Sequence, residues 1–209
     1  KDNHQSFTIF FLFMIAMKRY DSDKFPLCNE RHIVGTRRKA REKVMQLLVA
    51  CSTGEIAWEE IFPHIVHRDF TFNDQESEPK KLLTPEEVLE LESDTRINWD
   101  EVELDFIKDL TSRTLDEMEY SDGLIERFAQ NWELDRIALI DRILLRMAVA
   151  ELIHFPEIPT KVTINEIIEL AKGYSTDKSN VFINGVLDAV VVELTTSERL
   201  KKSGRGLHE

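Results

Sequence analysis

From Thr36 onward, apolar residues recur at helical spacing, and no stretch of convincing length alternates with the period of two that marks a strand. Thr36 is a favourable N-cap for a first helix. The apolar positions of that helix fall on one face: Val44, Leu47, Leu48 and Cys51. STG at 52–54 is expected to end it, and EIAWEEIF at 55–62 begins a second helix that Pro63 must end or kink.

The middle of the chain predicts a loop followed by more helices. Residues 71–81 are polar and lack periodicity, so they are expected to form a loop. TPEEVLELE at 84–92 opens with a capping box and predicts a helix. A long amphipathic stretch follows from Trp99 to Phe128, and YSD at 120–122 is the expected point at which it breaks in two.

The C-terminal third predicts three further helical features. Residues 134–155 are apolar around most of the helix circumference, which favours the central position in a bundle. Thr163 and Glu166 form a second capping box, and Gly173 is a natural residue to follow a helix end. A last helix is expected to open near Ser175–Asp177. With only 7 Gly and 6 Pro, the chain predicts an all-α fold of six to eight helices.

These patterns divide the chain into a core domain and flanking segments. Residues 1–35 are interpreted as an N-terminal extension outside the fold, because their apolar run, Phe7 to Met17, is too short to span a bilayer and poor as a secretion signal. Residues 36–193 form the expected domain, interrupted by an acidic loop or insert at 68–97. Residues 194–209 are expected to be a tail.

Charge is sorted along the chain, whose formal net charge is −12. Residues 1–54 carry 10 Lys and Arg against 5 Asp and Glu, whereas residues 55–135 carry 7 against 24. Such sorting indicates partners of defined charge.

Catalytic and cofactor chemistry find little support. The six His pair with no evident nucleophile, and neither a phosphate-binding glycine motif nor zinc-ligand spacing occurs. Cys28 and Cys51 are too few for a disulfide framework and are expected to be reduced thiols of a cytoplasmic protein. The sequence therefore favours a binding protein over an enzyme and predicts no cofactor and no metal.

The segment TRRKAREK at 36–43 carries five cations and one acid. Arg37, Arg38, Lys39 and Arg41 lie in the first two turns of the expected helix, where each exposed cation opposes the helix dipole by about 0.3–1 kcal/mol. Charge placed against the helix's own stability suggests another role, such as contact with a phosphate backbone. From this segment alone, nucleic-acid binding and a merely solvated face are equally supported.

Two long motifs carry a resemblance to a known family. ALIDRILLRMAVAEL at 138–152, followed by IPTKVTINEIIELAKGYSTDKSNVFINGVLDAV at 158–190, resembles the NusB family of bacterial transcription antitermination factors. RRKARE at 37–42 is similar to the arginine-rich start of that family's first helix, and 105–128 resembles its middle. The resemblance runs from about residue 36 to about residue 193.

The resemblance implies an all-α fold of two small helical bundles that share a face. It further implies that the protein binds single-stranded boxA RNA of nascent rRNA together with NusE, a small-subunit ribosomal protein. The pair would join the antitermination complex of RNA polymerase and suppress premature termination. No membrane partner is implied, and a homodimer remains possible. The NusE contact is expected on the face of residues 99–146.

Carried over residue by residue, the family's RNA-binding motif falls on the basic segment and on the loop between the last two helices, at Arg37, Arg38, Lys39, Arg41, Lys178, Ser179 and Phe182. Within the loop, Lys178 and Ser179 would contact phosphate. Phe182 would offer a stacking face, and ordinary core packing explains it equally well.

Two other functions stay open. A NusB-like domain also occurs in some rRNA cytosine methyltransferases, so the chain could be a recognition domain acting with a separate catalytic chain, since only 16 residues follow Glu193. Alternatively, it could be a structural helical adaptor that does not bind RNA. Binding of boxA-like RNA with and without NusE separates this last hypothesis from the others.

Overall fold

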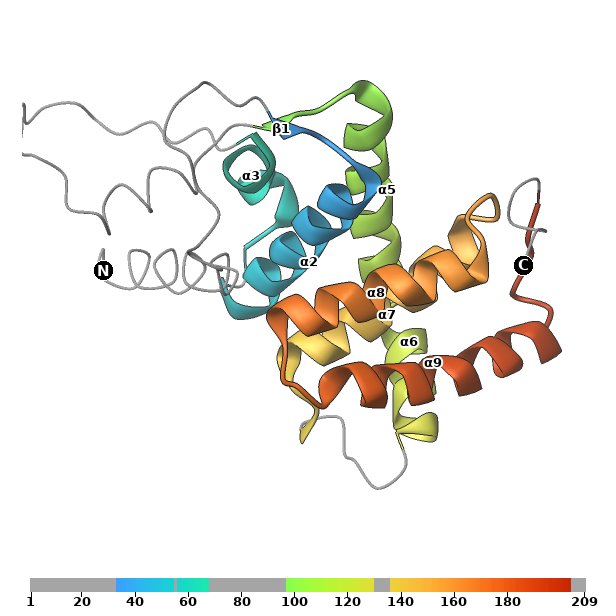
Figure 1. The fold of residues 1–209 in the computed structure, drawn as a ribbon. Helices are drawn as coiled ribbons and strands as arrows, with labels where there is room; N and C mark the ends of the chain where they lie inside the picture. Colours follow the sequence, from blue (N-terminus) through green and yellow to red (C-terminus); the bar gives the residue numbers. More distant parts are fainter. Residues whose placement is uncertain (1–32, 55, 68–96, 130–135, 204–209) are drawn as a thin grey trace, which may run out of the picture.

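The computed structural model describes residues 33–54, 56–67, 97–129 and 136–203 (Figure 1). Most of the expected N-terminal extension, the loop at 71–81 and the helix at 84–92 lie outside these ranges. Residues 33–35, which the sequence assigns to the extension, belong to the described fold.

The described part of the chain contains seven α-helices: α2 (Arg37–Gly54), α3 (Trp58–Phe62), α5 (Glu101–Asp116), α6 (Met118–Phe128), α7 (Leu139–His154), α8 (Thr160–Tyr174) and α9 (Ser179–Thr196). After α3, the backbone continues at Pro63 as a π-helical turn, η2 (Pro63–His67). This confirms the predicted all-α fold. None of these helices has the length and hydropathy needed to cross a bilayer.

Two strands too short to leave a period-two signature tie the start of the fold to its middle. β1 (Ile33–Val34) pairs in parallel with β2 (Ile97–Asn98). Gly35 then donates its N–H to the Asn98 carbonyl at 2.8 Å, and the Trp99 ring lies where a Gly35 Cβ would stand. The Trp99 indole donates to the Val66 carbonyl at 3.0 Å, so η2 joins the same junction.

The helices form two groups around α7 (Figure 1). α2, α3 and α5 pack together on one side, and α6, α8 and α9 on the other. α7 contacts helices of both groups, and its apolar residues from Ile143 to Leu152 are buried. The expected central helix is therefore confirmed, and its apolar circumference is explained by packing on both sides.

Several helix ends differ from the sequence-based expectation. The amphipathic stretch breaks at Glu117, not at 120–122. α8 begins at Thr160, so Thr163 lies inside the helix and does not cap it. Gly173 lies within α8, which ends at Tyr174 with Ser175 as its C-cap. The last helix, α9, begins at Ser179. Pro159 is the extended N-cap residue of α8, and its carbonyl accepts the N–H groups of Val162 and Thr163 at 3.0 and 3.2 Å.

Candidate nucleic-acid interface

The basic segment forms the first turns of α2, as predicted. Thr36 caps the helix, since its hydroxyl accepts the Lys39 N–H at 3.3 Å. The four predicted cations differ in exposure: the side chains of Arg38, Arg37 and Lys39 are 60%, 42% and 36% exposed, whereas that of Arg41 is 3% exposed. Three of the four therefore reach solvent, and the fourth belongs to the interior.

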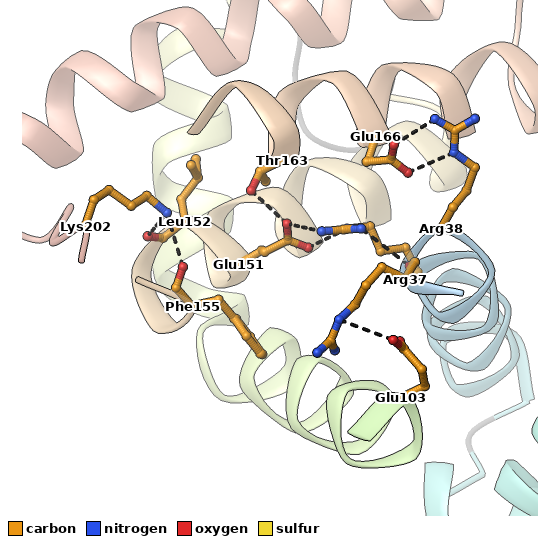
Figure 2. A network of polar contacts seen from close by, with 10 residues as sticks. Arg37, Arg38, Glu103, Glu151, Leu152, Phe155, Thr163, Glu166 and Lys202 are labelled. Carbon is orange, nitrogen blue, oxygen red and sulfur yellow. Dashed lines mark hydrogen bonds and ion pairs between the residues drawn. The ribbon is translucent and has the colours of Figure 1, made fainter. Parts of the chain in front are cut away.

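Arg41 holds α2 onto the central helix. Its guanidinium donates two hydrogen bonds of 2.7 Å to the carboxylate of Glu151, which is itself buried in α7. The Thr163 hydroxyl donates to the same carboxylate at 2.7 Å, and Figure 2 shows this network. The paired guanidinium donors of Arg41 are thus already used by Glu151 and are not available to a phosphate. The placement of Arg41 among RNA-contacting residues is therefore corrected to a structural role.

Arg37 is held more loosely. Its guanidinium lies 4.2 Å from the centroid of the Phe106 ring, and its Nε is 3.6 Å from Glu103 Oε1, beyond hydrogen-bond distance. Arg37 Nη1 and Glu103 Oε2 are buried and have no hydrogen-bond partner. Stacking on the ring orients Arg37, while part of its donor capacity stays unused.

Arg38 makes a two-pronged contact with α8. Its Nε and Nη2 donate to the two carboxylate oxygens of Glu166 at 3.0 and 2.7 Å (Figure 2). The hydrogen bond from Arg38 holds the pKa of Glu166 below its ordinary value, against the smaller opposing effect of burial. The pair is thus ionised at neutral pH, with its cation at the surface.

Lys39 faces a carboxylate shared with the end of α8. Its Nζ lies 2.9 Å from Glu42 Oε2, and the Tyr174 hydroxyl donates to Glu42 Oε1 at 2.5 Å. Burial of Glu42 raises the pKa of its carboxyl, but the Tyr174 hydrogen bond and the charge of Lys39 together outweigh this and lower it. Tyr174 directly precedes the loop at 175–180, so this contact brings the basic segment and the loop together.

The loop at 175–180 is braced from below by α7. The hydroxyls of Ser175 and Ser179 donate to the two oxygens of Asp141 at 2.5 and 2.7 Å. Ser179 is 2% exposed, so its predicted phosphate contact is corrected to this bracing role. Lys178 is exposed, as a phosphate contact requires. Phe182 is half-buried against the core, which agrees with the packing alternative.

The structure thus brings together an exposed basic strip, consisting of Arg37, Arg38 and Lys39 on α2, and the loop that carries Lys178. It also adds residues that the local sequence did not indicate. Each predicted cation of α2 faces a carboxylate, and three of these come from other helices: Glu103, Glu151 and Glu166. No local sequence motif predicts these carboxylates, because they lie far from the basic segment in the sequence.

Comparison with known proteins shows which family the chain resembles. The sequence model of the NusB family matches residues 68–192. The chain is 53% identical over 103 residues to transcription antitermination protein NusB of Salinibacter ruber, and 48% identical over 103 residues to that of Chloroherpeton thalassium. Each match covers 49% of this chain, and they cover 64% and 49% of the two relatives, respectively.

Two solved structures share the fold. Thermotoga maritima NusB superposes with a TM-score of 0.59 at 26% identity, over 80% of this chain and 98% of that one. A chain of the NusB–NusE complex with double-stranded RNA superposes with a TM-score of 0.55 at 24% identity, over 75% of this chain and 96% of that one. Both similarities extend over most of the fold described above.

Proposed function

Because this chain belongs to the NusB family, we propose that it acts as a transcription antitermination factor that binds single-stranded boxA RNA of nascent rRNA together with NusE. In this role it joins the antitermination complex of RNA polymerase in the cytoplasm and suppresses premature termination. It works by binding and carries out no catalysis.

The observation that carries this proposal is the exposed basic strip beside the loop at 175–180. Arg37, Arg38 and Lys39 present three cations at the start of one helix, and Lys178 adds a fourth from the adjacent loop. Arg and Lys side chains that neutralise phosphates supply most of the sequence-independent affinity for RNA. Arg37 and Arg38 can also stack on unpaired bases.

The charge of the rest of the molecule supports a basic protein partner. Exposed acids line α5 and α6, among them Glu101, Asp105, Asp109, Asp116, Glu119 and Glu126. A protein of net charge −12 repels RNA at long range, so its basic strip alone should bind RNA weakly. A basic ribosomal protein on the face of residues 99–146 would relieve this repulsion. The solved NusB–NusE complex with double-stranded RNA makes NusE the natural candidate.

The test is a titration of a boxA-like single-stranded RNA with the full chain, with and without NusE, against a scrambled RNA of equal length. We expect weak binding alone and clearly tighter, sequence-dependent binding with NusE. Absence of binding in both cases would support the structural adaptor instead. Equal affinity with and without NusE would remove the ribosomal protein from the proposal.

A further inference from the structure

The contact between Arg38 and Glu166 has the geometry in which arginine binds phosphate. Both oxygens of the Glu166 carboxylate accept from the Arg38 guanidinium, at 3.0 and 2.7 Å. A phosphodiester offers two non-bridging oxygens to the same fork of donors. The carboxylate therefore uses the same two donors that a phosphate would need.

We propose that Glu166 competes with RNA phosphate for the guanidinium of Arg38 and thereby sets the RNA affinity of the basic strip. This inference rests on the proposed function, because it assigns an affinity-limiting residue to the same surface. In the free protein Glu166 holds Arg38 against α8. On binding, the phosphate takes over the guanidinium, and the carboxylate loses its partner.

The exposure of the two side chains makes this exchange feasible. Arg38 is 60% exposed, so its guanidinium can swing away from the protein, while Glu166 is 17% exposed and stays on α8. Exposed ion pairs are individually weak, so breaking this one does not forbid binding. Breaking the buried pair of Arg41 and Glu151 would cost much more, because it would leave an unpaired charge in the core.

Glu169 provides a matched control on the same helix. It lies three residues after Glu166, carries the same charge, and pairs with Lys172 instead of Arg38. Glu166→Gln and Glu169→Gln therefore change the net charge equally. Only the first removes the carboxylate from the Arg38 fork. Their comparison separates competition for Arg38 from a general reduction of negative charge.

The experiment measures the affinity of the full chain for a boxA-like RNA, with NusE present throughout. We expect Glu166→Gln to tighten binding by about two- to fivefold and Glu169→Gln to have a smaller effect. In an Arg38→Gln background, the gain from Glu166→Gln should vanish, because the two residues act through one contact. Glu166→Ala keeps high helix propensity and should show the same gain.

Three results would overturn the inference. The first is an equal gain in RNA affinity from Glu166→Gln and Glu169→Gln. The second is RNA binding by both Glu166 variants that is unchanged or weaker while the variants still melt cooperatively. The third is a gain from Glu166→Gln that persists in the Arg38→Gln background. Each leaves the proposed function standing as long as the wild-type chain binds RNA. If the wild-type chain binds no RNA even with NusE, the proposed function fails, and the inference fails with it.

Discussion

Arg41 and Glu151 lie 110 positions apart in the sequence and meet in the core through two hydrogen bonds of 2.7 Å. The pair joins α2 to the central helix α7, and Thr163 of α8 adds a third helix by donating to the same carboxylate. The network fixes the orientation of α2, whose first turns carry the basic strip. The surface proposed to bind RNA therefore depends on a buried cation in the same short segment.

Breaking this pair from one side should strongly destabilise the fold. Arg41→Gln leaves the buried carboxylate of Glu151 without its cation, which typically costs about 3–5 kcal/mol. Urea denaturation measures the loss. Arg38→Gln is the matched control, because it removes an exposed arginine from the same helix and should cost less than about 1 kcal/mol. Equal losses in the two variants would mean that Arg41 is not a structural cation.

Two glycines should respond to alanine in opposite directions. A Cβ at Gly185, inside α9, meets nothing within 4 Å, so Gly185→Ala should stabilise the protein by about 0.5–1 kcal/mol through helix propensity. A Cβ at Gly35 would lie 2.3 Å from the Trp99 ring, so Gly35→Ala must displace that ring at the junction of β1 and β2. We expect a loss of about 1–3 kcal/mol there. Thermal melting of both variants measures the direction of the two stability changes. A Gly35→Ala variant more stable than the wild type would contradict the described packing of Trp99 against Gly35.

Acid should weaken the attachment of α8 to α2. The pKa values of Glu166 and Glu42 lie below their ordinary values in the folded protein, so the folded state holds fewer protons than the unfolded state in that range. Their contribution to stability is complete above the ordinary glutamate pKa and is lost as the pH falls through the lowered values. Urea midpoints at about pH 7 and about pH 4 measure this loss. The double variant Glu42→Gln, Glu166→Gln should show a smaller loss, and an identical loss would refute the assignment.

The sequence predicts the presence of the helices better than the positions of their ends, because the two depend on different numbers of residues. Apolar periodicity extends over many residues, so α2, α5 and α7 were evident from their faces. Their ends depend on single residues: Pro159 is the N-cap of α8, ahead of the apparent capping box, and the Thr163 hydroxyl donates to the distant carboxylate of Glu151. Local sequence offers Thr163 as a cap, and tertiary structure assigns it elsewhere.

The basic strip was predictable, whereas the partners of its residues were not. One signal could have separated Arg41 from the others, since it shares a helix face with Val44 and Leu48, three and seven positions later, and both are buried. The carboxylates of Glu103, Glu151 and Glu166 come from three other helices, so no spacing in the sequence relates them to the cations. The competition proposed for Glu166 could be inferred only from the folded structure, in which this residue contacts Arg38.

The central claim is that the basic strip of α2 binds RNA phosphates, and the salt dependence of binding tests it most directly. The measurement is the affinity for one boxA-like RNA at several salt concentrations with NusE present. It compares the wild type with the triple variant Arg37→Gln, Arg38→Gln, Lys39→Gln. Lys201→Gln is the control, because this exposed lysine follows the end of α9 and lies outside both the basic strip and the face of residues 99–146.

Each phosphate contact on single-stranded RNA contributes about 0.7 to the slope of log K against log salt. We therefore expect the triple variant to lose about 2 from the magnitude of that slope and the Lys201 control to keep the wild-type value, with all three proteins melting cooperatively. A triple variant that folds and retains the wild-type slope would contradict the claim and move the RNA site elsewhere on the molecule.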